Sequence, residues 1–227
     1  MGEAGRLASS ERVVADILRA VRLLREERLL DWTGGALSVR TDAGPLVTRG
    51  GSARAFWELT AGDVILCPPG GNPSAARGLR PPIGVEVHHA IYALFPECGA
   101  VLHSHAGAAY LASCLSSGLQ GLPPLEPIGE VPVLGRPVAH PDTGDPDARA
   151  ARESGVLIPE LAALASERGS ALREHGLAFL DHAHGVYVLA KNLPGALTEM
   201  ARVDAGARLW LAAGRADGGG GGRARHA

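Results

Sequence analysis

The sequence is nearly devoid of lysine, since Lys191 is its only one and arginine supplies the rest of the positive charge. Lys191 lies in AKNLPGA, between an expected strand and an expected helix, where we expect a solvated loop. Schiff-base chemistry needs a desolvated lysine that gives up its proton readily. The sequence therefore argues against a lysine-dependent aldolase and against a pyridoxal enzyme.

Cysteines are also few, and long apolar runs are missing. Cys67, Cys98 and Cys114 form neither a CxxC pair nor a disulfide framework, which indicates a reducing compartment. The charged N-terminal stretch does not resemble a signal peptide, and no run reaches the roughly 18 apolar residues that span a bilayer. With a net charge of −2, we expect a cytoplasmic protein that acts on a small molecule, without nucleic-acid or membrane partners.

Aromatic residues make up only 4% of the chain against 46% for all hydrophobic types, so the core must be mostly aliphatic. Helical periodicity and short apolar runs intermix along the 227 residues without a repeat. We therefore expect an α/β fold, a single domain over residues 1–213 with a mixed or mostly antiparallel sheet covered by helices on both sides. Residues 214–227 are rich in glycine and arginine and are expected to form a disordered tail.

The most informative stretch is AVLHSHAGAAYLAS, in which His103 and His105 follow an apolar run. If this run is a strand, both imidazoles share one face, because side chains alternate with a period of two. A second pair, His182 and His184, precedes another expected strand. Three histidines with an open fourth position form a common catalytic zinc site. His103 and His105 with either His182 or His184 could form one, although two half-buried, hydrogen-bonded histidines are the simpler interpretation of an isolated pair.

Several stretches together resemble the class II aldolase/adducin family over roughly residues 9–211. They are WTGGALSVR, VTRGG with ELTAGDVIL, HHAIYALFPECGAVLHSHAGAAYLAS and HGVYVLAKNLPGALTEM. The resemblance implies that family's fold, a homotetramer, and a divalent metal ion, most often Zn²⁺, on His103, His105 and His184. His182 would then be a solvated neighbour and His88 a packing or hydrogen-bonding residue.

The resemblance leaves the proton-transferring carboxylate open. Many aldolase members carry a carboxylate where this sequence has Gly84, and Glu86 lies two positions away. In one branch, the methylthioribulose-1-phosphate dehydratases, the catalytic glutamate lies in a segment that resembles PLEPIGEV, where Glu126 stands here. A glutamate near the metal could act as a general base. Glu126 and Glu86 are therefore the candidate catalytic residues.

A phosphate-binding site is expected at two glycine-rich turns, because glycine amides and an arginine can surround an anion. Its candidate residues are Gly34, Gly35, Arg49, Gly50, Gly51 and Ser52.

The resemblance implies a metal-dependent lyase that acts on a keto sugar or a sugar phosphate through an enediolate. A dehydration like that of the methylthioribulose-1-phosphate dehydratases is the favoured reaction. Retro-aldol cleavage or epimerisation at the same metal is the enzymatic alternative, because the metal polarises the substrate without selecting the reaction. A non-catalytic, adducin-like module is the other alternative.

Overall fold

The computed structural model describes residues 3–30, 34–50, 59–70, 80–82, 84–115, 118–119, 131–135 and 152–218. Within these residues, eight strands form a sheet in the order β3-β2-β1-β4-β8-β7-β6-β5. The pairs are antiparallel except β6 with β7, which confirms the expected mixed, mostly antiparallel sheet. The strands are β1 (Gly35–Thr41), β2 (Gly44–Thr48), β3 (Val64–Leu66), β4 (Ala100–Ser104), β5 (Gly118–Leu119), β6 (Val131–Leu134), β7 (Leu177–Asp181) and β8 (Gly185–Ala190).

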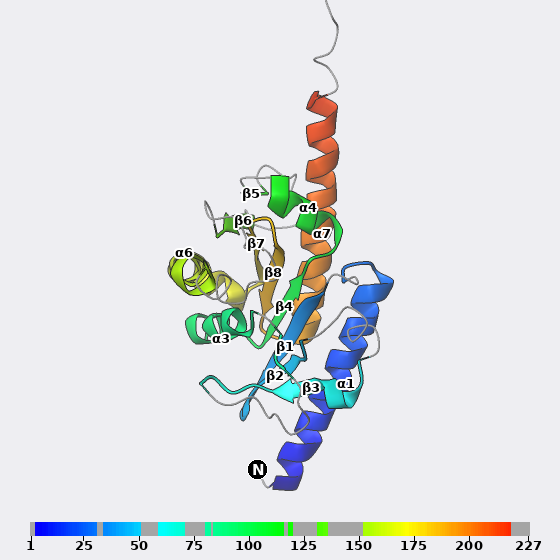
Figure 1. Ribbon diagram of the computed structural model, residues 1–227, viewed down its shortest axis with the longest axis vertical. Helices are drawn as coiled ribbons and strands as arrows, with labels where there is room; N and C mark the ends of the chain where they lie inside the picture. The colour runs from blue at the N-terminus through cyan, green and yellow to red at the C-terminus, as the bar shows by residue number, and fades with distance from the viewer. Residues whose placement is uncertain are drawn as a thin grey trace, which may run out of the picture.

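Helices cover both faces of this sheet, as the sequence predicts (Figure 1). One face packs against α1 (Glu3–Glu26), α4 (Gly107–Leu115) and α7 (Leu193–Gly218), and their aliphatic side chains form one buried cluster with the strands. The other face packs against α3 (Val85–Leu94) and α6 (Ile158–Arg168) in a second cluster. Two short 3₁₀ segments, Ala61–Asp63 and Gly169–Arg173, complete the elements.

The alternation along β4 decides which way the first histidine points. Ala100 and Leu102 belong to the cluster under α1, α4 and α7, whereas Val101 belongs to the cluster under α3 and α6. Since side chains alternate along a strand, His103 shares the face of Val101. His103 therefore points into the layer between the sheet and helices α3 and α6.

Two helices differ from their sequence expectation. The expected helix over residues 156–169 is a π-helical segment, Glu153–Leu157, followed by α6. Pro159 lies in the first turn of α6. Its ring lacks an N–H and would clash with a carbonyl one turn earlier, and the wider π turn relieves this conflict.

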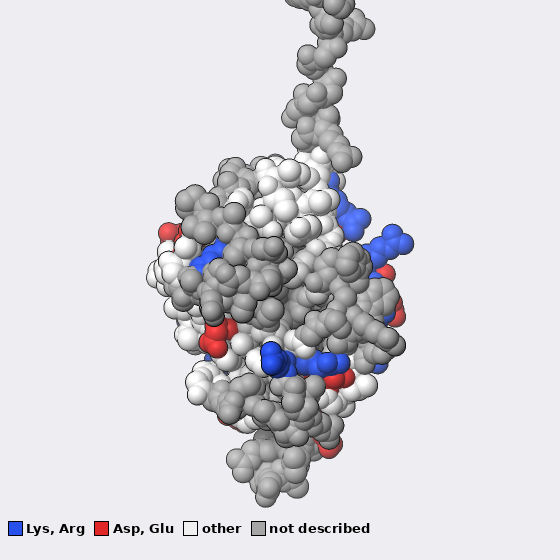
Figure 2. Space-filling model, viewed as in Figure 1, with Lys and Arg blue, Asp and Glu red and all other residues white. Residues whose placement is uncertain are grey.

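The last helix, α7, continues to Gly218, so the first residues of the expected tail 214–227 are helical. The predicted disorder of the remainder falls on residues 219–227, which lie outside the described residues. None of the described helices combines the length and apolarity needed to cross a membrane. On the face shown in Figure 2, the described basic and acidic side chains are interspersed rather than gathered into one large field of either sign.

The carboxylate of Asp204 on α7 fixes the start of α4, which directly follows the two histidines of β4. Its Oδ1 accepts hydrogen bonds from the backbone N–H of Ala108 at 2.6 Å and of Ala109 at 3.4 Å. Its Oδ2 accepts a bond of 2.6 Å from Arg208. Asp204 thus satisfies amides at a helix N-terminus that would otherwise lack a partner.

We expect Asp204→Ala to lower the free energy of unfolding by about 1–2 kcal/mol, the usual cost of losing a helix cap. Asp204→Asn should lose less, because an amide oxygen can still accept from Ala108. Urea unfolding curves give both values, with Asp42→Ala in the exposed turn after β1 as the control. Equal losses in Asp204→Ala and Asp42→Ala would contradict the capping role.

Candidate metal centre

Three histidines from two neighbouring strands meet at one point. His103 is near the end of β4, His105 follows that strand, and His184 lies in the turn between β7 and β8. Each offers one ring nitrogen, and these nitrogens all lie within 4.8 Å of one another. The ring centroids are 4.4–4.8 Å apart. The choice that the sequence left open between His182 and His184 therefore falls on His184.

Hydrogen bonds fix which nitrogen two of these histidines present. The Nδ1 of His103 donates to the carbonyl oxygen of Val186 at 3.0 Å. The Nδ1 of His184 donates to the Oδ2 of Asp181 at 2.9 Å. With Nδ1 protonated, each neutral ring keeps the lone pair on Nε2. The Nε2 of His105 lies 2.8 Å from the Nε2 of His103, so three Nε2 atoms converge.

This donor set fits a divalent metal ion. Neutral imidazoles held through Nδ1 are ordinary ligands of zinc, and three of them leave a coordination position for substrate. Burial and the neighbouring His105 and His184 keep the pKa of His103 well below its ordinary value, so its ring is neutral at physiological pH.

Behind His184 lies a buried ion pair that the sequence did not reveal. Asp181 accepts the His184 bond with one oxygen and pairs with the guanidinium of Arg152 through the other. The side chains of Asp181 and Arg152 are only 1% and 2% exposed. Burial alone would raise the pKa of Asp181, but the hydrogen bonds from His184 and Arg152 lower it overall. Asp181 therefore stays ionised and holds the His184 ring in one orientation.

The remaining histidines near the centre have other partners. His88 on α3 is buried and shares a 2.7 Å hydrogen bond between its Nδ1 and the hydroxyl of Ser38. Burial, with the neighbouring His89, lowers the pKa of His88 to about 3, so this ring remains neutral in the core. His182 is half-buried, and its backbone N–H donates to Leu134.

The glycine turn lies directly against the histidine pair. A Cβ placed on Gly34 would lie 3.9 Å from the Nδ1 of His105. A Cβ on Gly35 would lie 2.5 Å from the carbonyl oxygen of His103 and 2.7 Å from Leu30. Only glycine permits this close approach of β1 to β4. Gly34 and Gly35 thus border the centre, and their role in substrate binding stays a prediction.

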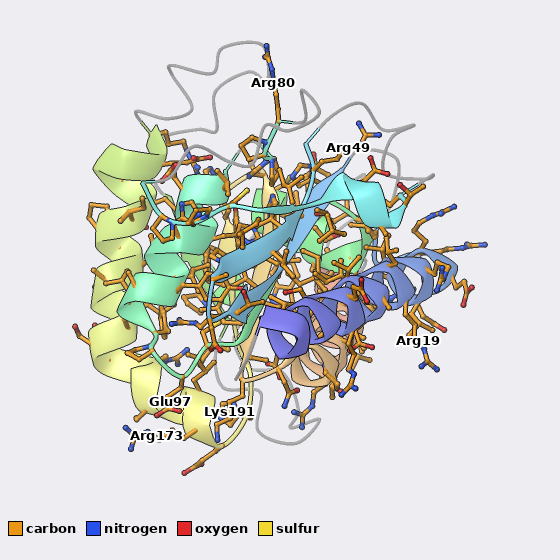
Figure 3. All side chains as sticks on the ribbon, turned by 90° about the horizontal axis from the view of Figure 1, so that it is seen from below. Arg19, Arg49, Arg80, Glu97, Arg173 and Lys191 are labelled. Carbon is orange, nitrogen blue, oxygen red and sulfur yellow. The ribbon has the colours of Figure 1, made fainter. Side chains whose placement is uncertain are left out.

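The second predicted phosphate-binding turn is partly described. Arg49 forms a 2.6 Å ion pair with Asp63, and the N–H of Gly50 donates to the carbonyl of Arg80 at 2.9 Å. Figure 3 shows Arg49 and Arg80 at the same end of the molecule. Arg80 is an exposed cation near this turn that the sequence did not single out. Gly51 and Ser52 lie outside the described residues, so their predicted role stays untested.

Of the two candidate catalytic carboxylates, the structure describes only Glu86. The side chain of Glu86 is 73% exposed, and its Oε2 lies 3.4 Å from the Nδ1 of His89. Glu126 lies outside the described residues.

Lys191 is in the loop position that the sequence indicates, where it donates to the carbonyl of Arg173. Lys191 follows β8 and His184 precedes it, so the six residues of that strand separate them by about 20 Å.

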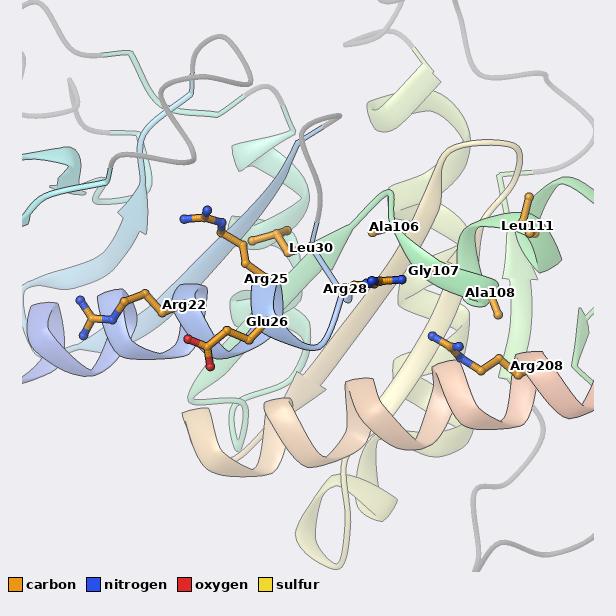
Figure 4. A pocket seen from close by; sticks show the side chains of 10 residues that line it. All are labelled: Arg22, Arg25, Glu26, Arg28, Leu30, Ala106, Gly107, Ala108, Leu111 and Arg208. Atoms are coloured by element: carbon orange, nitrogen blue, oxygen red, sulfur yellow. The ribbon is translucent and has the colours of Figure 1, made fainter.

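A cavity of about 910 Å³ adjoins the segment that follows His105. It is lined by Ala106 and Gly107 and by arginines of α1, α7 and the turn after α1. Figure 4 shows Arg28 and Arg208 reaching towards this segment. Three arginines, Arg22, Arg25 and Arg28, are spaced three residues apart, so they lie near one face of α1 and just beyond its end. This spacing is the feature of the sequence that indicates a positively charged side of the cavity.

Residues 15–211 match the family model described as the class II aldolase and adducin N-terminal domain. The chain belongs to the class II aldolase and adducin family. Methylthioribulose-1-phosphate dehydratase of Gluconobacter oxydans is 28% identical over 191 residues, which cover 81% of this chain and 84% of that protein.

Two solved structures share the fold. L-fuculose-1-phosphate aldolase of Thermus thermophilus has a TM-score of 0.62 and 26% identity, over 94% of this chain and 100% of that one. YgbL of Escherichia coli has a TM-score of 0.67 and 23% identity, over 88% and 89% of the two chains. Membership of the family supports lyase activity and implies a divalent metal ion, for which His103, His105 and His184 are the group that the described residues bring together.

We expect Asp181→Asn to weaken metal binding by about 10–100-fold, since the residue that orients His184 loses its charge. Competition with a chromophoric chelator would measure the affinity. Asp16→Asn on the exposed face of α1 is the matched control. An unchanged affinity in Asp181→Asn would show that the Asp181–His184 bond does not prepare the site.

Proposed function

We propose that this protein is a zinc-dependent lyase that removes water from a phosphorylated keto sugar, as methylthioribulose-1-phosphate dehydratases do. The observation that carries the proposal is the convergence of three imidazoles, two of them held through Nδ1 so that Nε2 faces the centre. A divalent ion there would polarise a substrate carbonyl as a Lewis acid. The dehydratase relative and the phosphate candidates Gly34, Gly35, Arg49, Gly50, Gly51 and Ser52 support the substrate class.

The protein's own residues have two tasks in this reaction. Asp181 and the carbonyl of Val186 hold His184 and His103 in place, so the centre needs little rearrangement when substrate arrives. A carboxylate must also move the proton beside the substrate carbonyl. Among the sequence candidates, Glu126 remains the one proposed by resemblance, whereas Glu86 faces solvent and His89.

Retro-aldol cleavage of a sugar phosphate is the second candidate, favoured by the similarity to L-fuculose-1-phosphate aldolase. Both reactions begin with polarisation of the same carbonyl, so the histidines fit either one. The non-catalytic, adducin-like alternative is disfavoured, because a module without catalysis has no need for Asp181 and Val186 to orient two converging histidines.

The first test is metal content and product analysis of the purified protein. We expect about one zinc ion per chain, lost in a His103→Ala/His105→Ala variant and kept in His175→Ala, whose ring bonds to Gly176 outside the centre. With 5-methylthioribulose 1-phosphate, mass spectrometry should show a product lighter by one water. Two fragments from a keto-sugar phosphate would indicate the aldolase instead. A protein that holds no metal after reconstitution would overturn the lyase.

We also propose a cytoplasmic homotetramer. Leu111 and Leu115 on α4 and Leu209 on α7 are 51%, 69% and 45% exposed, on two helices that pack together. Large exposed apolar side chains on two adjoining helices support a subunit interface at this surface. Light scattering should give about four times the 23.4 kDa of one chain, and Leu111→Gln/Leu115→Gln should lower this mass. A monomer at micromolar concentration would contradict the assembly.

A further inference from the structure

A buried glutamate outside the sequence candidates lies in the layer between the sheet and helices α3 and α6, the layer into which His103 points. Glu153 is in the π-helical segment before α6, and only 6% of its surface is exposed. Carboxylates are rarely this buried in proteins unless they have a partner or a task. The preceding residue, Arg152, is itself buried and pairs with Asp181. The segment therefore directs two polar side chains into the layer between the sheet and the helices.

Gly84 at the start of α3 opens the space that Glu153 faces. Gly84 has a φ of 88°, and a Cβ placed on it would lie 3.5 Å from the Oε1 of Glu153 and 3.3 Å from the hydroxyl oxygen of Tyr187. A side chain at this position would occupy the space between these two oxygens. Because glycine has no side chain, the space next to the Glu153 carboxylate and the Tyr187 hydroxyl stays open.

Two neighbours of Glu153, Tyr187 and Arg152, are connected to the metal centre. On one side, Tyr187 pairs with His103 across β8 and β4, and their rings stack with centroids 4.0 Å apart. On the other side, Arg152 pairs with Asp181, which holds His184. Glu153 therefore shares the space beside Gly84 with a residue that stacks on His103, and it follows a residue that pairs with the partner of His184.

We infer that Glu153 is the catalytic carboxylate that transfers the substrate proton at this centre; the inference rests on the proposed lyase function. The carboxylate takes the proton from the carbon beside the substrate carbonyl, and the electron pair of that C–H bond forms an enediolate. The enediolate then breaks the bond to a neighbouring hydroxyl group. That group receives the proton from Glu153 and leaves as water, so the carboxylate is regenerated and no other reactant is needed.

The test is solvent exchange at the carbon beside the carbonyl, because this carbon loses a proton before dehydration and gains one after cleavage. The zinc-reconstituted protein is incubated in D₂O with dihydroxyacetone phosphate, a small phosphorylated hydroxy ketone, and followed by NMR. We expect Glu153→Gln to slow deuterium incorporation about 10²–10⁴-fold while it keeps the zinc content and unfolding midpoint of the wild type. Glu153→Asp should recover part of the rate. Glu167→Gln, an exposed glutamate of α6, should match the wild type.

The pH dependence of the exchange rate provides a further readout. In the wild type the rate should fall at acidic pH as the carboxylate becomes protonated, and this acidic limb should be lost from the residual rate of Glu153→Gln. If Glu153 had only a structural role, the exchange rate of Glu153→Gln would still fall at acidic pH. Exchange at the wild-type rate in Glu153→Gln, with a loss confined to Glu126→Gln, would overturn the assignment.

A binding measurement separates this inference from the proposed function. Acetohydroxamate presents two chelating oxygens and loses a proton when it binds a metal ion. Titration calorimetry in buffers of different ionisation enthalpy counts the protons released. We expect Glu153→Gln to release about one proton more than the wild type, because the carboxylate no longer accepts it.

The combined outcomes are distinguishable. Exchange in the wild type, with neither a slower rate nor an extra proton in Glu153→Gln, overturns the assignment of Glu153 and leaves the lyase standing. No exchange in the wild type, with the extra proton still seen in Glu153→Gln, overturns the lyase and keeps Glu153 as the proton acceptor of the centre. Neither exchange nor an extra proton overturns both.

Discussion

The antiparallel pairing of β4 with β8 is the constraint on which the centre depends. Its register sets His103 opposite Tyr187 and Ser104 opposite Val186. A slip of one residue would turn His103 to the other face of the sheet, into the aliphatic cluster under α1, α4 and α7. The pairing also brings the turn before β8, and with it His184, to the end of β4. The positions of the three histidines therefore depend on the packing of this strand pair.

That packing is strong because the two strands lie in the middle of the sheet. The residues of β8 and of β4 are buried throughout. Aliphatic side chains on one face of the pair pack under α1, α4 and α7, whereas those on the other face share their layer with His88, His103 and Tyr187. The asymmetry separates a face that stabilises the fold from a face on which polar groups can be supported by hydrogen bonds.

The sequence predicted the features that are local in the chain. The apolar run with His103 and His105 indicated a strand and a shared direction, and the glycines at 34 and 35 indicated a close turn. It left His182 and His184 as alternatives, because spacing alone does not show how the turn is bent. In the structure, Ala183 takes a left-handed conformation with φ 57°, and Asp181 three residues earlier binds His184.

Other features could not be predicted because they join segments that are distant in the chain. The pair of Arg152 with Asp181 spans 29 residues, and neither residue belongs to a recognisable motif. The burial of Glu153 follows from the π-helical segment, whose only local sign is Pro159 a few residues later. In the sequence, Gly84 stands where many aldolases of the family carry a carboxylate. The structure shows that its small size leaves space next to Glu153 and Tyr187.

The scarcity of lysine has a practical consequence for handling the protein. Lys191 is exposed, and it lies at the end of β8 opposite to His184. Apart from the chain's amino terminus, it is therefore the single place where amine-directed reagents can attach a fluorophore or a solid support. Coupling through this residue would hold every molecule in the same orientation, with the end of β8 that carries the histidine cluster turned away from the support.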